Sequence, residues 1–260
     1  MKLSVIVPCY NEVENVPKLR DELLPIITGL VGDVQSFDSH RFHSAELIFV
    51  DDGSQDGTYA QLTSCLGNYR HSQITFKFLE HERNRGLGAA MRTGFSNASG
   101  EIILTVDSDG TYPFIEIPPL LAMLTPAVDL VTASPYHPAG GVIGVPAHRL
   151  LLSKGSSFMY RVLANWKVHT YTCLFRAYRS DVVKNISFRS DGFLAGTEIL
   201  VYALQRGYRV AEFPTTLHRR MYGVSKARIL RTILAHLRFQ VWVLVYRLRC
   251  LVGVEAKQPR

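Results

Sequence analysis

Apolar and polar residues follow one another along this chain in blocks that predict strands alternating with helices. Runs with the length and composition of buried strands occupy residues 3–7, 47–50, 74–79, 102–106, 129–133 and 210–214. Helical spacing of apolar residues, or helix-start signals, mark residues 15–30, 56–66, 86–97, 115–124, 149–166, 191–205 and 226–250. This order predicts an α/β, Rossmann-like fold in which helices cover both faces of a mostly parallel sheet.

Two segments between these elements are predicted to be loops. Residues 31–44 are polar and rich in Asp, Ser and His, which indicates an exposed connection. Residues 135–146 hold three prolines and three glycines, which interrupt regular structure. A chain of 260 residues without an internal repeat fits one large domain with a substantial core.

Carboxylates follow three of the predicted strands directly. Asn11-Glu12 comes after the first strand, Asp51-Asp52 after the second, and Asp107-Ser108-Asp109 after the strand at 102–106. In parallel α/β sheets, ligands bind beyond the carboxyl ends of the strands. The three motifs are therefore expected to meet at one site.

The pair Asp107 and Asp109 has the spacing of a divalent-cation site. Alternate residues past a strand end can turn two carboxylates toward one ion, and Mg²⁺ and Mn²⁺ prefer such oxygen ligands. A bound cation would stabilise a departing nucleoside diphosphate. The competing interpretation of Asp107-Ser108-Asp109 alone is a solvated turn, because Asp and Gly favour turns.

The other two motifs are suited to a nucleoside. Asp51 and Asp52 can accept hydrogen bonds from a base or a ribose, while Asp56 fits a helix N-cap. Tyr10 can face a base or ribose, and Glu12 can accept hydrogen bonds from either. On its own, the segment around Tyr10 would be interpreted as a loop that starts a helix.

Together the three motifs resemble the family 2 glycosyltransferases of the GT-A fold. Further segments narrow the resemblance to the polyprenol-phosphate sugar synthases, the group that includes the dolichol-phosphate mannose synthases. The segments that carry it are Val5–Glu12, Asp51–Thr58, Asn84–Ala90, Asp107–Asp109 with Tyr112-Pro113, Phe175–Arg179, Gly207–Val210 and Arg220–Lys226. The likeness covers most of residues 1–230.

The resemblance implies roles for individual residues. Pro8, Tyr10, Glu12 and Asp51 would line the nucleoside, Asp107 and Asp109 would hold Mg²⁺ or Mn²⁺, and Arg149, Lys154, Arg220 and Lys226 would lie near the phosphates of donor or acceptor. The substrate-binding set expected from the motifs is Pro8, Tyr10, Asn11, Glu12, Asp51, Asp52, Gly88, Ser108, Arg149, Lys154 and Lys226, and the catalytic set is Asp107, Asp109, Glu198 and Arg220.

The chain departs from the family pattern on the acceptor side. Pro135 stands where relatives usually carry an arginine before the tyrosine, and Thr170–Arg176 differs from the usual Asp-x-Thr-Ser-Gly-Phe-Arg. These changes put the acceptor in doubt more than the donor. Glu198 lies where many inverting relatives place a carboxylate base, so it would take the proton of a hydroxyl acceptor. The alternative is an acid in the first turn of a helix.

Positive charge is concentrated at the C-terminus. Residues 219–260 hold ten lysines and arginines and one acid, a net charge of +9, whereas residues 1–218 hold 19 basic and 21 acidic residues, a net charge of −2. In the helix predicted at 226–250, Leu237, Val241 and Leu244 share a face that Arg231 and Arg238 flank. This pattern predicts a helix lying in a membrane interface. The alternative is packing on its own domain or on a second subunit.

Composition excludes several other classes. The four cysteines are scattered without a CxxC pair, so neither a disulfide framework nor a zinc site is expected. No signal peptide and no apolar run near the roughly 18 residues of a membrane-spanning helix is visible. Basic–aromatic signatures of RNA binding are missing, so no nucleic-acid partner is expected. A sugar nucleotidylyltransferase would need a glycine-rich phosphate loop with a basic residue after the first strand, where this chain has Pro8–Glu12. A membrane adaptor without catalytic activity would not need Asp107 and Asp109, so their presence argues against that class.

The sequence thus predicts two parts. Residues 1–225 would form a GT-A domain, with a nucleotide-sugar half at 1–133 and an acceptor half at 134–225, and residues 226–260 a basic amphipathic helix and tail. The expected activity is metal-dependent, inverting transfer of a hexose from GDP-mannose or a UDP-sugar to a polyprenyl or dolichyl phosphate. The enzyme would be cytoplasmic and peripheral on the cytoplasmic membrane face, with homo-oligomer formation left open. The alternative activity is transfer to a hydroxyl of a sugar or glycolipid with Glu198 as base.

Overall fold

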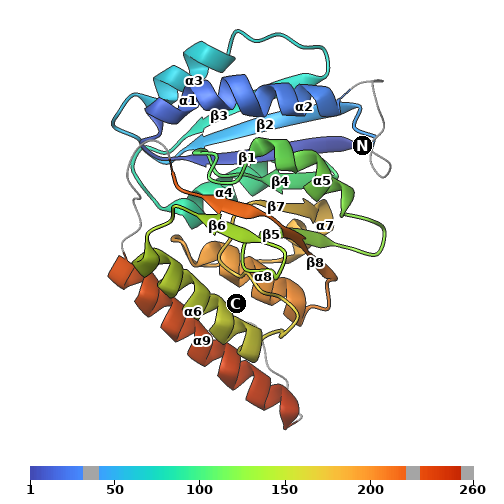
Figure 1. Ribbon diagram of the computed structural model, residues 1–260. Coiled ribbons are helices and arrows are strands. Elements are labelled where there is room, and N and C mark those ends of the chain that lie inside the picture. The colour runs from blue at the N-terminus through green and yellow to red at the C-terminus, as the bar shows by residue number, and fades with distance from the viewer. Residues whose placement is uncertain (32–40, 221–228, 253–260) are drawn as a thin grey trace.

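A computed structural model describes residues 1–31, 41–220 and 229–252 of the chain (Figure 1). A central sheet of seven strands has the order β3-β2-β1-β4-β7-β5-β8. Its strands are β1 (Lys2–Cys9), β2 (Ser44–Asp51), β3 (Ile74–Glu80), β4 (Ile102–Thr105), β5 (Leu130–Ser134), β7 (Arg176–Arg179) and β8 (Val210–Pro214). All neighbouring strands pair in parallel except β7, which runs antiparallel to both β4 and β5. The predicted mostly parallel sheet is therefore confirmed.

Helices cover both faces of the sheet. They are α1 (Val16–Lys18), α2 (Leu24–Leu30), α3 (Thr58–Leu66), α4 (Leu87–Asn97), α5 (Ile117–Ala122), α6 (Ala147–Leu163), α7 (Ser180–Asn185), α8 (Ala195–Gln205) and α9 (Ile229–Leu251). Short 3₁₀ turns η1 (Val13–Asn15) and η3 (Phe114–Glu116) precede α1 and α5, and a π-helical turn η2 (Leu19–Leu23) joins α1 to α2. The π turn ends beside Pro25, which has no N–H to continue the α-helical ladder.

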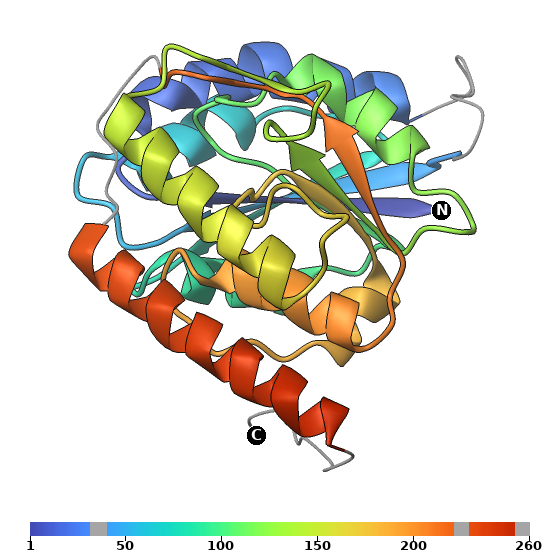
Figure 2. The ribbon, with the colours of Figure 1, turned by 60° about the horizontal axis from the view of Figure 1, so that its bottom comes forward.

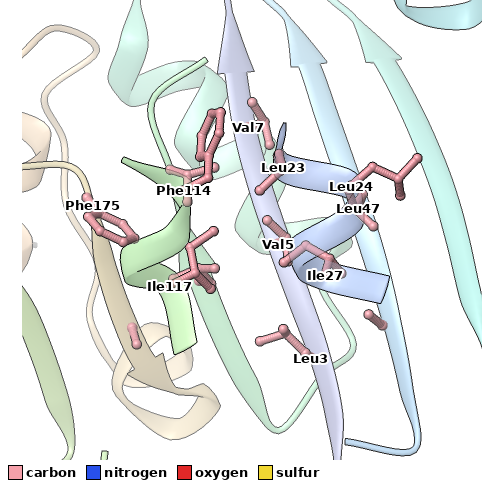
Figure 3. Packing of buried hydrophobic residues seen from close by; sticks show 14 of the residues in the cluster. Leu3, Val5, Val7, Leu23, Leu24, Ile27, Leu47, Phe114, Ile117 and Phe175 are labelled. Atoms are coloured by element: carbon pink, nitrogen blue, oxygen red, sulfur yellow. The ribbon is translucent and has the colours of Figure 1, made fainter. Parts of the chain in front are cut away.

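Strand β1 carries apolar residues on both of its faces. Leu3, Val5 and Val7 face the cluster that contains α2 and α5, where Leu23, Leu24 and Ile27 pack against them (Figure 3). Ile6 faces the opposite cluster with α4 and α8. Because successive side chains of a strand point to opposite faces, a strand that is covered on both sides carries apolar residues on both faces. The exception in β1 is Ser4, which is buried and donates to Glu46.

Strand β2 begins earlier than the sequence predicts. The additional part of the strand contains Glu46, which is buried. A charged residue is not expected inside a sheet from the sequence pattern. The side chain is paired with Lys2 at 3.0 Å and Lys77 at 2.9 Å, and it accepts a hydrogen bond from Ser4 Oγ at 2.6 Å. The partners come from two strands, β1 and β3, and only the assembled sheet brings them to the charge of Glu46.

Some elements were not predicted. Strand β7 was missed because arginines occupy two of its four positions, and helix α7 follows it directly. The segment 135–146, predicted as a loop, contains the three-residue strand β6 (Gly141–Ile143), which pairs in parallel with β9 (Thr216–His218). The predicted loop at 31–44 falls largely on residues 32–40, outside the described residues.

Helices α6 and α9 form an outer layer against the second half of the sheet (Figures 1 and 2). Tyr160 of α6 lies 6.0 Å, ring to ring, from Phe239 of α9, and its hydroxyl lies 3.2 Å from His236 Nδ1. One side of α9 thus packs on its own domain. Within the described ranges, no helix is both long and apolar enough to cross a membrane.

Candidate active site

A cleft of about 740 Å³ opens at the carboxyl ends of β1, β2 and β4. Its size is within the range of small-ligand sites. Its walls are Pro8, Cys9, Tyr10, Glu12, Asp52, Asn84, Gly86, Leu87, Ala90, Asp107, Ser108, Asp109, Thr111, Val145, Pro146, Arg149, Leu174, Phe193, Leu217, His218, Arg219 and Arg220. The three acidic motifs therefore meet at one cleft, as their positions after parallel strands predict.

Carboxylates from two of the motifs gather around one arginine. Arg220 Nε donates to Asp109 Oδ2 at 2.7 Å, and Arg220 Nη2 donates to Glu12 Oε1 at 2.5 Å. Asp109 Oδ1 accepts from the backbone N–H of Thr111 at 3.0 Å, and Glu12 Oε2 accepts from Asn15 Nδ2 at 2.6 Å. Residues 208 positions apart in the sequence thus share one ionic cluster.

Asp107 belongs to the same electrostatic cluster. Burial and the charge of Asp109 raise the pKa of Asp107, and burial raises the pKa of Glu12 despite the neighbouring Arg220. Among the described residues of this cluster, three carboxylates face one guanidinium, so full ionisation would leave an excess of two negative charges there. A divalent cation would balance that charge, and Asp107 and Asp109 offer the oxygen ligands that Mg²⁺ and Mn²⁺ prefer.

The described residues do not by themselves enclose a metal ion. Within residues 1–31, 41–220 and 229–252, no three His, Cys, Asp or Glu side chains converge closely enough to enclose an ion. Water and a diphosphate can supply further ligands to a cation held by Asp107 and Asp109. Mg²⁺ is commonly held in this way, by one or two carboxylates together with substrate phosphates.

Asp52 holds a loop of the cleft. Its carboxylate accepts hydrogen bonds from the backbone N–H groups of Arg85 and Gly86, at 2.9 and 2.7 Å, and from Asn84 Nδ2 at 2.9 Å. His81 Nδ1 lies 2.7 Å from the same carboxylate. Both oxygens of Asp52 therefore have partners within the protein. The predicted contact of Asp52 with a base or ribose stays a prediction.

Two other predicted nucleoside ligands do not line the cleft. Asp51 is fully buried, and its carboxylate accepts hydrogen bonds from the N–H and the hydroxyl of Ser54. Asn11, at a φ of 52°, accepts from Gln55 N–H at 2.8 Å and donates its own N–H to Ser54 Oγ. Asn11 thus joins the loop after β1 to the loop after β2, and Asp51 holds Ser54 within the second loop.

Gly88 and Glu198 support a loop beside the cleft. A Cβ on Gly88 would lie 2.0 Å from the carbonyl oxygen of Ser190, so only glycine lets α4 start against this loop. Glu198 accepts hydrogen bonds from the N–H groups of Arg189 and Ser190, at 3.1 and 2.8 Å. Neither residue is part of the cleft wall, whereas Phe193, at the end of the loop, is.

The predicted cations separate into different environments. Arg149, in the first turn of α6, lines the cleft, and so does Arg220. Lys154 instead lies over the ring of Tyr136, 5.7 Å from its centroid, and is not part of the wall. Lys226 lies outside the described residues.

The structure adds site residues that the sequence did not identify. His218 and Arg219 extend the basic wall beside Arg220, and their only sequence signal is that they precede it. Leu174 and Phe193 form part of an apolar wall and had no signal, because both come from loops that tertiary packing brings to the cleft. Cys9 also lines the cleft, and burial raises the pKa of its thiol.

Comparison with known proteins agrees with this geometry. The sequence profile described as Glycosyl transferase family 2 matches residues 4–187. A polyprenol monophosphomannose synthase of Mycolicibacterium smegmatis is 32% identical over 228 residues, 85% of this chain and 79% of that protein. A dolichol-phosphate mannosyltransferase of Pyrococcus furiosus is 30% identical over 251 residues, 95% of this chain but only 64% of that protein.

Solved structures show the same fold. Glucosyl-3-phosphoglycerate synthase from Mycobacterium tuberculosis, in complex with Mn²⁺, UDP-glucose and phosphoglyceric acid, has a TM-score of 0.65 at 17% identity, over 98% of this chain and 81% of that one. The same enzyme with Mg²⁺ and UDP has a TM-score of 0.64 at 18% identity, over 92% and 79%. The profile match over most of the chain and the 32% identical relative decide the family. This chain is a glycosyltransferase and belongs to glycosyl transferase family 2.

Proposed function

We propose that this glycosyltransferase moves a hexose from a nucleotide sugar to a polyprenyl phosphate with inversion at the anomeric carbon, and that it requires Mg²⁺ or Mn²⁺. The donor would be GDP-mannose or a UDP-sugar. The observation that carries this proposal is the cleft that combines Asp107 and Asp109 with a basic wall of Arg149, Arg219 and Arg220. The similarity of the chain to a polyprenol monophosphomannose synthase and a dolichol-phosphate mannosyltransferase supports a polyprenyl phosphate as the acceptor.

The two kinds of charge suit the two substrates. Asp107 and Asp109 would hold the divalent cation, which would offset the negative charge that develops on the departing nucleoside diphosphate. Arg149 and Arg219 lie on the wall where an anionic acceptor can be held close to an anionic donor. Without such cations, the two phosphate groups would repel each other.

The reaction would be a single in-line displacement. An oxygen of the acceptor phosphate forms a bond to the anomeric carbon, while the bond from that carbon to the diphosphate oxygen breaks and its electron pair leaves with the nucleoside diphosphate. The acceptor oxygen is already ionised near neutral pH, so no strong general base is needed. Pro8, near the end of β1, and Tyr10, directly after β1, lie on the cleft wall and would contact the nucleoside.

A direct assay tests the proposal. The protein is incubated with labelled GDP-mannose, UDP-glucose, UDP-galactose or UDP-GlcNAc, with Mn²⁺ or Mg²⁺ and a short-chain polyprenyl phosphate. We expect a chloroform-soluble labelled product with one of these donors and none after chelation of the metal. Absence of product with every donor would contradict the proposed acceptor.

The outer surface of α9 supports a place at the membrane. Apolar side chains are exposed along its length, at Leu230, Leu234, Leu237, Val241, Leu244, Val245, Leu248 and Leu251. Between Ile229 and Leu251 the helix carries four arginines and no acid. Exposed Leu151, Phe158 and Val162 extend the apolar surface onto α6. Apolar side chains next to cations favour an anionic lipid surface, and roughly 1 kcal/mol per cation is available there.

Vesicle binding checks this role of α9. We expect the protein to sediment with vesicles of phosphatidylcholine and phosphatidylglycerol, less with phosphatidylcholine alone, and less in 0.5 M salt. The double change Leu237→Glu and Leu244→Glu should weaken binding about tenfold or more, because both side chains are exposed on the proposed surface. Ile115→Glu alters an apolar side chain that is 68% exposed but lies in η3. Equal losses in both variants would speak against α9 as the contact.

The hydroxyl-acceptor alternative depends on Glu198. Burial raises the pKa of Glu198, which suits a general base, but both backbone N–H groups that it accepts belong to the loop at 189–190. The carboxylate is also not part of the cleft wall. These contacts favour a role in holding the loop that ends at Phe193.

Glu198→Gln separates the two activities. Gln keeps one carbonyl oxygen for the loop, so we expect turnover with a polyprenyl phosphate to stay within tenfold of the original protein and nucleotide binding to be unchanged. Loss of about 1–2 kcal/mol of stability is expected from the weakened hydrogen bonds. If Glu198 were the base, turnover would fall by a factor of 10² or more with nucleotide binding intact. Calorimetric nucleotide binding and steady-state rates distinguish these results.

A further inference from the structure

Arg220 occupies a central position in the acidic cluster of the cleft. Its Nε lies 2.7 Å from Asp109 Oδ2 and its Nη2 lies 2.5 Å from Glu12 Oε1, so one guanidinium joins both carboxylates. The Arg220 side chain is only 20% exposed, and those of Glu12 and Asp109 are 5% and 11% exposed. Such contacts are charge-assisted and much stronger than those of a solvated arginine.

The contact to Asp109 conflicts with metal binding at the same oxygen. A divalent cation would lie roughly 2.0–2.2 Å from Asp109 Oδ2, and the guanidinium nitrogen already lies 2.7 Å from that atom. Asp109 Oδ1 is engaged as well, by the N–H of Thr111. Two cations on one oxygen repel each other, so a metal ion on Asp109 Oδ2 favours release of Arg220 from that oxygen.

After leaving Asp109, Arg220 could bind the diphosphate of the donor. The cleft that it lines is the one where a nucleoside diphosphate would bring two further negative charges. Guanidinium groups bind phosphate oxygens as they bind carboxylates, through paired N–H donors. The same residue can therefore neutralise the carboxylates before the substrate arrives and the diphosphate afterwards.

We propose that Arg220 is an exchangeable counter-ion, which neutralises Glu12 and Asp109 in the metal-free enzyme and moves to the donor diphosphate when a divalent cation replaces it. The inference rests on the proposed metal-dependent function of the cleft. It goes further by making the arginine a competitor of the metal when no nucleotide is present, and a partner of the metal when nucleotide is bound. Arg220 thus weakens the binding of a metal ion in the absence of nucleotide, and it strengthens the binding of nucleotide together with the metal ion.

The test measures binding and not turnover. The affinity for Mn²⁺ alone is measured by the electron paramagnetic resonance signal of free Mn²⁺, and the affinities for UDP and for GDP at saturating Mn²⁺ by calorimetry. For Arg220→Gln we expect Mn²⁺ alone to bind about tenfold more tightly than to the original protein. The nucleoside diphosphate that the original protein binds should bind at least tenfold more weakly.

Matched variants separate exchange from a general loss of charge. Arg219→Gln removes the same charge from the adjacent position on the cleft wall, which is exposed, and we expect it to change the Mn²⁺ affinity less than threefold. Arg220→Lys keeps the charge but lacks the fork that spans two carboxylates, so an intermediate Mn²⁺ affinity is expected and this variant serves if Arg220→Gln does not fold.

Opposite results would overturn the proposal. If Arg220→Gln, or Arg220→Lys in its place, binds Mn²⁺ no more tightly than the original protein, or if Arg219→Gln gains as much, Arg220 does not compete with the metal. If neither the original protein nor any variant binds Mn²⁺, the exchange and the proposed metal dependence fail together. Normal Mn²⁺ and nucleotide binding without any change in Arg220→Gln would remove the exchange alone and leave the proposed function standing.

Discussion

Replacing Asp107 by Asn is expected to lower turnover about 10³-fold or more while leaving the fold intact. The amide is a poorer ligand for Mg²⁺ or Mn²⁺ and carries no charge to offset the cation, so stabilisation of the departing diphosphate, worth several kcal/mol, is lost. Stability should not fall, because burial and Asp109 already disfavour the charged form of Asp107. The measurements are the rate of sugar transfer, Mn²⁺ affinity, and the midpoint of thermal unfolding.

The control for Asp107→Asn is Glu14→Gln, which removes an exposed charge close in sequence to the cluster. We expect this variant to keep its rate within twofold. Chelation of metal should reduce the original protein to the rate of Asp107→Asn, and added Mn²⁺ should restore only the original protein. A rate for Asp107→Asn within tenfold of the original, with unchanged Mn²⁺ affinity, would rule out the aspartate pair as the metal site.

Replacing Arg176 by Ala is expected to destabilise the fold by about 4 kcal/mol. Arg176 lies in β7 at the centre of the sheet, with 0% of its surface exposed. Its guanidinium donates to Thr132 Oγ1 at 3.0 Å, to the carbonyl of Tyr171 at 2.9 Å, and to the carbonyl of Gly196. Alanine would leave a cavity and would strand buried acceptors without donors.

Denaturant unfolding measures this loss, with Arg70→Ala as the matched control. Arg70 also donates to backbone carbonyls, those of Gly67 and Tyr69, but it is exposed. Because water can replace those hydrogen bonds, its removal should cost less than about 0.5 kcal/mol. A loss of stability below 1 kcal/mol for Arg176→Ala would mean that the three hydrogen bonds do not hold β7 to β5, to α8 and to the loop that precedes β7.

For the acidic residues that follow the strands, the local sequence pattern predicts their positions, whereas the tertiary structure determines their partners. The position of Glu12, Asp52 and Asp107 could be predicted, because each follows an apolar run and parallel strands end at one edge of the sheet. The partners of these residues could not. Asp52 is held by a loop more than 30 residues later, and Glu12 by Arg220, 208 residues later.

The alternation of strands and helices, the edge of the sheet where the cleft lies, and the family could all be derived from the amino-acid sequence. Apolar periodicity and short motifs encode these features locally, so they can be read without knowing what packs where. Three features required the folded chain: β7 runs antiparallel inside the sheet, Glu198 holds a loop, and Arg220 pairs with Asp109 and Glu12. The reason is physical: buried polar and charged side chains are stable only where distant segments supply their partners, and no local pattern specifies which distant segment that is.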